Sequence, residues 1–506
     1  MSSSTLDKDF PVLVAIDFGT TFSGCAYAYT PHDKVPKLIS EWPSQNMHYA
    51  KTPTVSLYKK ANGRHKMAAW GWNSTMQRGP PGYGNLLLYK YKIHLDENVD
   101  MPAWTHPVSV PNAISDYLKA LHDYAAEKIG QELGRRFTRK DFRYCLTVPA
   151  MWSDRAKDTM RKAAVRAGLI KQSDHPDRLI LVTEPEAAAL YCERECKEYN
   201  LKHGDRFLIC DAGGGTVDLI VYDITESAAG RSLAEVTKGH GASCGSMLID
   251  LNFGNLLIEK FAGQSANIPD DIIPKLVEKF AYAHKPHFNG VDDLYVELPW
   301  VSFFNSLKDP DAIGIDEGVM CFAAAELKEK VFDPVVERVL ALIRDQLDKA
   351  TKCSAIFLVG GFGSSTYLLN RVTKEFGTKV KIISKPHRPE IAVVFGAVYA
   401  GMEPRKVTAR VTRCCYGVGG NGNSRGGSIP VFVVDGNPPR YTTNLSSSAF
   451  IRIPDVFKAT DPAGHEVPYK LKFYFGLSEI RVEAIVLGRS HQTRLQFDDI
   501  GVKPSR

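Results

Sequence analysis

Two apolar runs with a glycine turn between them occur in the middle of the chain. Residues 207–223 read FLICDAGGGTVDLIVYD, in which one apolar run ends at Asp211 and a second ends near Tyr222. Apolar runs on both sides of a short glycine segment predict a strand, a tight turn and a returning strand. Three adjacent glycines weaken regular structure, so they fit a turn with positive φ or a place where another group approaches the backbone closely.

A second copy of this pattern lies near the start of the sequence. Residues 12–29 read VLVAIDFGTTFSGCAYAY, with Asp17 at the position of Asp211 and Gly19 at the position of Gly213. Repeated units share an architecture, so two such hairpins about 190 residues apart predict two lobes that face one ligand.

Elsewhere, strand and helix patterns alternate. Apolar residues at helical spacing predict a helix over residues 112–129 that stops at Gly130. Thr183 and Glu186 have the spacing of a capping box at the start of another helix. Further strands are expected at 143–148, 179–182 and 355–359, and further helices at 153–167, from Asp333 onward and at 389–401. The last hundred or so residues carry short alternating runs, which predict a small antiparallel β domain.

Composition narrows the class of protein. With 506 residues and 44% hydrophobic content, the chain can form roughly two to four domain-sized units. A net charge of +6 with interspersed signs gives no reason to expect nucleic acid or a membrane as partner. No apolar stretch has the length of a signal peptide core or a membrane span, so a cytoplasmic protein is expected. The ten cysteines lack zinc-site spacing and are expected to be reduced thiols.

Both glycine turns suit the binding of phosphate. Successive N–H groups of such a turn can point at one anion, and a carboxylate at a strand end can hold the accompanying Mg²⁺ through its waters. The metal would then lie between Asp17 and Asp211. The chain has no GxxxxGK[ST] motif, which excludes a Walker loop. A glycine hairpin without a ligand is the alternative interpretation.

Five segments make the chain resemble the actin-like ATPase superfamily. They are DFGTT at 17–21, TVPA at 147–150, TEPEAAAL at 183–190, DAGGGTVD at 211–218 and LVGGFGSS at 358–365. In this order they resemble the seventy-kilodalton heat-shock chaperones, and most of all their divergent short branch of heat-shock seventy-kilodalton protein twelve type, in a fungal-like form. The resemblance covers roughly residues 10–400.

The resemblance implies an α/β fold with two duplicated, ribonuclease-H-like lobes and a small antiparallel β domain. Lobe I would span residues 10–204 and lobe II residues 205–384. A closing helix at 385–404 would return to lobe I, and a β-rich module would fill 405–506.

It also implies catalytic roles. Glu184 would position the attacking water, with Asp218 as a second carboxylate nearby, although acidic residues also favour helix N-termini for structural reasons. Lys92 would reach the phosphates, with Lys90 as the alternative; without the resemblance both would be assigned to an exposed edge strand.

Contacts to ATP or ADP are implied for three groups of residues. Around the first turn these are Gly19, Thr20, Thr21 and Phe22, and around the second Gly213, Gly214, Gly215 and Thr216, with the threonines donating to phosphate oxygens. The third group is expected around the adenosine and comprises Gly245, Lys285, Gly360, Gly361, Phe362 and Glu390.

Several of these positions depart from the typical chaperone pattern. Tyr282 and Pro286 stand where a glutamate and an arginine are usual, and Glu390 replaces an aspartate. Phe362 lies near the place of a base-stacking arginine; it would either stack on the base or belong to the core.

These features predict a Mg-dependent, ATP-hydrolysing, chaperone-like protein whose lobes clamp the nucleotide. Extended or unfolded peptides and co-chaperones are the partners that the resemblance implies, although the β module is short and lacks an obvious helical lid and an acidic tail. The alternatives are a nucleotide sensor or scaffold without hydrolysis, a small-molecule kinase and a cytoskeletal filament.

Overall fold

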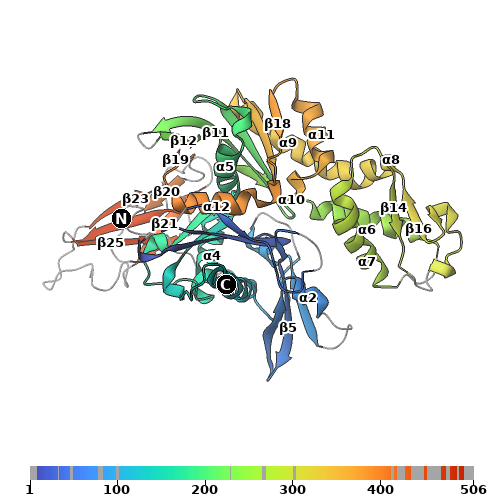
Figure 1. Cartoon of the computed structure of the whole chain (residues 1–506), viewed down its shortest axis with the longest axis horizontal. Helices are drawn as coiled ribbons and strands as arrows, with labels where there is room; N and C mark the ends of the chain where they lie inside the picture. The colour runs from blue at the N-terminus through green and yellow to red at the C-terminus, as the bar shows by residue number, and fades with distance from the viewer. Residues whose placement is uncertain are drawn as a thin grey trace.

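Two mixed sheets with helices between and around them form the centre of the molecule (Figure 1). The structure is a computed structural model, and it describes residues 8–31, 34–45, 49–77, 84–97, 102–227, 230–264, 269–299, 304–411, 415–418, 428–434, 449–452, 469–474, 479–486 and 489–494.

The first sheet has the strand order β3-β2-β1-β8-β9. Its strands are β1 (Val12–Asp17), β2 (Phe22–Tyr29), β3 (Lys37–Ile39), β8 (Phe142–Val148) and β9 (Leu179–Thr183). β2 is antiparallel to both β1 and β3, whereas β8 and β9 extend the sheet in parallel. Together with the helices that cover it, this sheet is called lobe I below.

The second sheet repeats this order as β12-β11-β10-β17-β18. Its strands are β10 (Arg206–Ala212), β11 (Val217–Ser227), β12 (Gly230–Glu235), β17 (Ala355–Val359) and β18 (Ile382–Ser384). Again the first two pairings are antiparallel and the next two parallel. The duplicated architecture predicted from the two hairpins is confirmed, and this second half is called lobe II.

Helices α3 (Val110–Glu132) and α4 (Asp154–Arg166) pack on lobe I and share its aromatic-rich core. The predicted stop at Gly130 is wrong, because α3 continues through it to Glu132 and the left-handed Gly134 follows, with φ of +62°. One glycine costs a helix only about 1 kcal/mol. At α4 the predicted cap is present, since Ser153 accepts a hydrogen bond from the Ala156 N–H.

A second, antiparallel sheet belongs to the first half of the chain. It has the order β6-β5-β7, with β5 (Val55–Ala61), β6 (Arg64–Trp70) and β7 (Asn85–Tyr89), and it is flanked by the short helix α2 (Trp72–Met76). A 3-10 helix, Tyr91–Leu95, follows β7 and brings the chain back to the lobe I core.

Two helices lie between the sheets, α5 (Glu184–Glu195) and α12 (Ala392–Met402) (Figure 1). They pack against each other, and one core cluster joins them to strands of both lobes. In α12, Gly396 is required by this contact, because a Cβ there would lie 1.7 Å from the Ala187 carbonyl oxygen.

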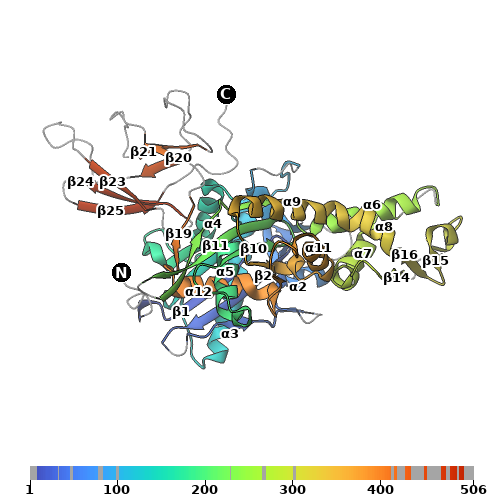
Figure 2. The same cartoon turned by 90° about the horizontal axis from the view of Figure 1, so that it is seen from above.

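The rest of lobe II extends to one end of the molecule in both views (Figures 1 and 2). This end contains α6 (Met247–Phe261), α7 (Ile272–Lys279), α8 (Ala324–Leu327), β14 (Leu294–Glu297), β15 (Ile315–Asp316) and β16 (Val319–Phe322). Three further helices of lobe II are α9 (Asp333–Ala350), α10 (Gly360–Gly363) and α11 (Thr366–Phe376).

The predicted helix is confirmed, since α9 begins at Asp333, but the N-cap residue is Phe332 and Asp333 does not cap the helix. The backbone is already helical from Ala324, and a π-helical segment, Lys328–Phe332, joins α8 to α9. Pro334 has no N–H, so the regular ladder is interrupted at this point and a wider turn accommodates it. Asp333 accepts hydrogen bonds from Tyr367 and Arg371 rather than capping the helix.

The C-terminal strands lie at the opposite end from β14–β16 (Figure 2). First β19 (Val407–Ala409) pairs in parallel with β12 at the edge of lobe II. Two antiparallel sheets follow, composed of β20 (Cys415–Val418), β21 (Ser428–Val434) and β22 (Ala449–Arg452), and of β23 (Tyr469–Tyr474), β24 (Arg481–Val486) and β25 (Arg489–Arg494). The predicted antiparallel β domain is confirmed for these strands. Among the described helices none has the length and apolar character needed to cross a bilayer.

Candidate functional site

The two predicted turns are in contact with each other. A Cβ on Gly214 would lie 2.3 Å from Thr21 Oγ1, and one on Gly215 would lie 2.7 Å from Thr20 Oγ1. The turn after β1 and the turn after β10 therefore face one another, as the repeat predicts. Side chains at these glycines would separate them.

The second turn is held from behind by the N-terminus of α6. The N–H groups of Gly245 and Met247 donate to the carbonyls of Gly215 (3.1 Å) and Gly214 (2.9 Å). A Cβ on Gly245 would lie 2.4 Å from the Gly214 carbonyl oxygen. Gly245 thus supports the turn from the side of lobe II. Within the turn, the Gly213 N–H donates to the Thr216 carbonyl at 2.9 Å.

Four buried carboxylates surround this junction. Asp17 and Asp211 occupy the ends of β1 and β10, Asp218 is paired with Asp211 across the second hairpin, and Glu184 is the first residue of α5. Asp218 also connects the lobes, because its Oδ1 accepts a hydrogen bond from the Met151 N–H at 3.1 Å. The predicted acidic residues are therefore brought together.

Burial and mutual repulsion shift the ionisation of this cluster. Burial, followed by the charges of Glu184, Asp17 and Asp218, raises the pKa of Asp211 well above its usual value. Burial also raises the pKa of Glu184 to about 7, against the opposing effect of Lys92. Close carboxylates taken out of water each disfavour the charged form of the others.

Lys92, the lysine chosen for the site, lies inside this cluster, so the alternative of a surface lysine on an edge strand does not hold for it. It belongs to the 3-10 helix Tyr91–Leu95, and its Nζ donates to Glu184 Oε1 at 2.6 Å. Its side chain is 3% exposed and lies near the rings of Phe18 and Trp152. Lys90, the alternative, is partly buried, and its pKa is lowered by burial while Asp250 opposes that shift.

Lys51 is a site residue that the sequence analysis missed. Its Nζ donates to Asp17 Oδ2 at 2.6 Å, while Thr147 donates to Asp17 Oδ1 at 3.0 Å. Although burial acts against it, the charges of Asp17, Tyr49 and Asp211 raise the pKa of Lys51. The segment KTPT at 51–54 has no spacing that marks its lysine, so no local signal could have found it.

This geometry does not fit the predicted Mg²⁺ pair well. Both oxygens of Asp17 already accept hydrogen bonds, one of them from an ammonium group. No group of three or more His, Cys, Asp or Glu side chains with the arrangement of a metal site occurs in the part of the chain that the structure describes. Asp211 instead lies beside Gly360 of its own lobe, which has φ of +84° and where a Cβ would lie 2.5 Å from Asp211 Oδ1.

On the predicted adenosine side, charged and aromatic groups cluster. Lys285 pairs with Asp250 at 2.7 Å. The ring centroid of Tyr282 lies 6.2 Å from that of Phe22 and 6.3 Å from that of Trp72. Aromatic rings from both lobes therefore meet here.

The remaining residues predicted for this side differ in placement. Gly361 lies beside the Tyr49 hydroxyl, and Glu390 pairs with Arg388 at 3.0 Å. Phe362 is 4% exposed and belongs to the lobe II core. The expected base contact of Phe362 is therefore not supported, and the core interpretation is the correct one.

The start of α5 differs from the predicted capping box. Thr183 is the N-cap residue, but its side chain makes no cap hydrogen bond. Glu186 does not reach back to it; instead its carboxylate accepts two hydrogen bonds from Arg410, just after β19. The acidic residue at this position binds a distant strand end rather than its own helix terminus.

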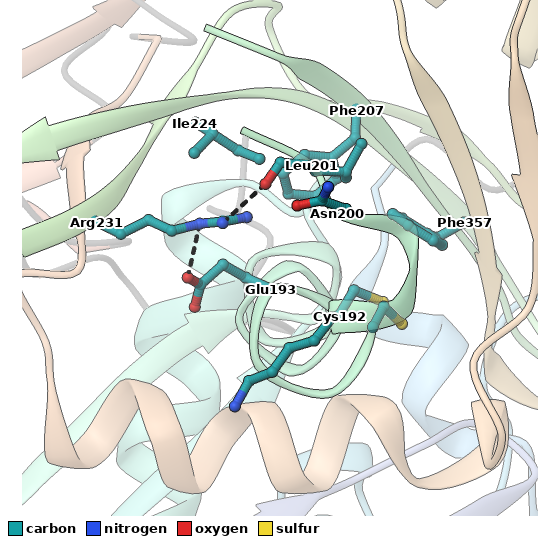
Figure 3. Close-up of a pocket in the computed structure, with 10 residues that line it drawn as sticks. Cys192, Glu193, Asn200, Leu201, Phe207, Ile224, Arg231 and Phe357 are labelled. Atoms are coloured by element: carbon teal, nitrogen blue, oxygen red, sulfur yellow. Dashed lines mark hydrogen bonds and ion pairs between the residues drawn. The ribbon is translucent and has the colours of Figure 1, made fainter. Parts of the chain in front are cut away.

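A cavity of about 200 Å³ lies at the opposite end of α5 (Figure 3). Cys192 and Cys196 line one wall, and Arg231 pairs with Glu193 at 3.1 Å and donates to the Leu201 carbonyl at 2.9 Å. Eight residues of helix, about 12 Å, separate Cys192 from Glu184. This cavity is thus distinct from the cluster around the two turns.

Comparison with known proteins gives a consistent result. No protein-family model matches the chain. Heat shock 70 kDa protein 12A of Mus musculus is 26% identical over 495 residues, which cover 81% of this chain and 72% of that protein. The Homo sapiens protein 12A is 25% identical over 502 residues, covering 83% of this chain and 73% of that protein. Heat shock 70 kDa protein 12B of Homo sapiens is 24% identical over 494 residues, which cover 81% of this chain and 71% of that protein.

The similarity extends over more than two thirds of each protein and agrees with the duplicated sheets and the two facing turns. The chain is therefore similar over most of its length to seventy-kilodalton heat-shock proteins of the twelve type, which supports the resemblance to the actin-like ATPase superfamily.

Proposed function

We propose that this protein binds ATP and ADP between its lobes and hydrolyses ATP slowly as a cytoplasmic, chaperone-like ATPase. One observation carries the proposal: two hairpin turns from separate lobes touch at a point surrounded by buried carboxylates and Lys92. Such a turn presents backbone N–H groups to an anion. The phosphates would lie against both turns, with Thr20, Thr21 and Thr216 as hydroxyl donors.

Glu184 and Lys92 carry the catalytic part of the proposal. Glu184 would orient the attacking water, and a pKa near 7 leaves it able to hold or accept a proton at physiological pH. Lys92 fixes the Glu184 carboxylate by direct contact and would offset charge that develops on the transferred group. Asp218, held by the Met151 N–H, would be the second carboxylate near the water.

Coupling to the C-terminal strands has a physical route. Lobe angle would depend on whether ATP or ADP lies between the turns. The helix α5, which begins with Glu184, is tied through Glu186 to Arg410 and hence to β19. Further along, Arg161 of α4 pairs with Glu479 beside β24 at 2.6 Å. Through these contacts nucleotide would control a β module that takes extended peptides and responds to co-chaperones. The same proposal includes the predicted boundaries at residues 204, 384 and 404, which separate lobe I, lobe II, the closing helix and the β-rich module.

A second candidate is a nucleotide sensor that does not hydrolyse ATP. The 2.6 Å contact between Lys92 and Glu184 favours it, because a carboxylate held by an ammonium group is a weaker partner for water. Tyr282, in its ring contacts with Phe22 and Trp72, also replaces the usual glutamate on the adenosine side.

Single-turnover hydrolysis of ATP separates the two candidates. The parent protein is compared with Glu184→Gln, and nucleotide binding is measured independently by calorimetry. Glu198→Gln is the matched control, because Glu198 is an exposed glutamate just beyond α5. Loss of one transition-state contact lowers the rate by about 10²–10³. Binding and hydrolysis in the parent, with binding alone in Glu184→Gln, support the ATPase. Binding without hydrolysis in both supports the sensor, and equal rates in both refute the role of Glu184.

A further inference from the structure

Lys51 is fixed beside the phosphate turn by the backbone around it. It precedes β4 (Thr52–Pro53), which pairs with the start of β2, and the Thr54 N–H donates to the Thr21 carbonyl at 2.8 Å. Its alkyl stem packs on Gly24, where a Cβ would lie 3.2 Å from Lys51 Cγ. The lysine therefore reaches Asp17 from a braced strand, and little side-chain freedom has to be lost on binding.

The ammonium group occupies a place where a cation is expected. Its contact with Asp17 is 2.6 Å long, and the two side chains are only 10% and 6% exposed. With Thr147 on the other oxygen, Asp17 has no carboxylate oxygen that is not already accepting a hydrogen bond. A hydrated divalent ion at Asp17 would have to displace a positively charged group held in the same spot, against repulsion that is strong in a buried site.

We propose that Lys51 is a built-in counter-ion of the phosphate site, taking at Asp17 the place of a hydrated divalent cation, so that nucleotide binding does not require such a cation. This inference rests on the proposed binding of nucleotide between the turns. Removal of the ammonium leaves the buried Asp17 carboxylate uncompensated, and a divalent cation becomes its natural partner.

The charge balance of the site sets the size of the effect. Asp17, Asp211, Asp218 and Glu184 face two ammonium groups, those of Lys51 and Lys92. With all four carboxylates ionised, two negative charges would be uncompensated. The raised pKa values of Asp211 and Glu184 lower this excess, so Mg²⁺ improves phosphate binding only to a small extent. The cation thus assists the parent protein, whereas it becomes essential once Lys51 is removed.

The experiment measures ATP and ADP affinity by calorimetry in excess EDTA and in excess Mg²⁺, for the parent, Lys51→Met and Lys60→Met. Methionine keeps the apolar stem, and Lys60 is an exposed lysine on β5 that serves as control. In the parent and the control, EDTA weakens nucleotide binding by less than about tenfold. Such a change in affinity is smaller than the contribution of one charged hydrogen bond. In Lys51→Met, EDTA weakens it by about 100-fold or more, since both cations are then missing.

A second readout needs no nucleotide. Electron paramagnetic resonance with Mn²⁺ reports binding of the ion to Lys51→Met and none to the parent. The inference is overturned if EDTA abolishes binding to the parent, or if the ratio of the two dissociation constants is the same in parent and variant. If Lys51→Met does not fold, the EDTA ratio of the parent still decides. Binding that occurs only with Mg²⁺ refutes the role of Lys51 and leaves the nucleotide function intact, whereas no binding under either condition refutes both.

Discussion

The ion pair between Glu186 and Arg410 should be a major contributor to the stability of the molecule. Arg410 Nε donates to Glu186 Oε2 at 3.1 Å, and its Nη2 donates to Oε1, so the pair is bidentate. The two side chains are 12% and 6% exposed. Next to them the Val411 N–H donates to Glu235 at 2.9 Å, which fixes the end of β19 against lobe II.

The magnitude of the effect follows from burial. Removal of one partner of a buried ion pair costs about 3–5 kcal/mol, because a charge remains without compensation in a site that excludes water. Because Arg410 is slightly exposed, we expect Arg410→Met to lower the free energy of unfolding by an amount near the lower end of this range, about 3 kcal/mol. An exposed pair contributes only about 0–1 kcal/mol. Such a pair is Lys349 with Asp345 on α9, where the side chains are 53% and 40% exposed.

Urea unfolding of the parent, Arg410→Met and Lys349→Met measures the difference in the free energy of unfolding. Arg410→Met should shift the midpoint clearly to lower urea, whereas Lys349→Met should scarcely move it. In the double variant Arg410→Met with Glu186→Met, most of the lost stability should return, since no charge is then left unpaired. Equal midpoints for Arg410→Met and Lys349→Met would refute the reasoning, as would a double variant less stable than Arg410→Met alone.

Two further predictions concern the site itself. Because burial raises the pKa of Glu184 to about 7, its carboxylate form increases with pH, so single-turnover hydrolysis should rise through pH 7 and level off above it. A pH–rate profile checks this, and a flat profile would contradict it. Gly214→Ala places a Cβ 2.3 Å from Thr21 Oγ1 and should lower the free energy of unfolding by about 1–3 kcal/mol while separating the two turns. Thermal unfolding and nucleotide titration measure both effects, and nucleotide affinity equal to that of the parent would show that the contact is dispensable.

Local pattern was sufficient for the parts of the fold that depend on neighbours in sequence. Each hairpin has apolar runs that continue across its own turn, so the strands ending at Asp17 and Asp211 could be placed from the sequence. The choice of Lys92 as a site residue, in contrast, came from resemblance alone, because periodicity around it indicates only an edge strand. Its burial is visible only in the structure.

The residues that were missed have partners that sequence spacing does not reveal. Lys51 binds Asp17, 34 residues away, and Arg410 binds Glu186, 224 residues away. Both lysine and arginine are usually exposed, so neither would be assigned to a buried pair without the three-dimensional structure. Thr183 shows the reverse error: its spacing to Glu186 is that of a capping box, but the carboxylate gains more from a guanidinium than from a backbone N–H.

The helix α5 contacts both the carboxylate cluster at the two turns and the chain just after β19. Glu184 and Glu186 are two positions apart, which corresponds to about 200° around a helix, so they point to opposite sides. The first contacts Lys92 in the cluster beside the two turns, and the second contacts Arg410 after β19. Because α5 packs between the sheets and against α12, a change in lobe angle has to move or rotate it. Any such movement would act on both carboxylates at once, so under the proposed function the state of the phosphate site would reach β19 without a separate relay.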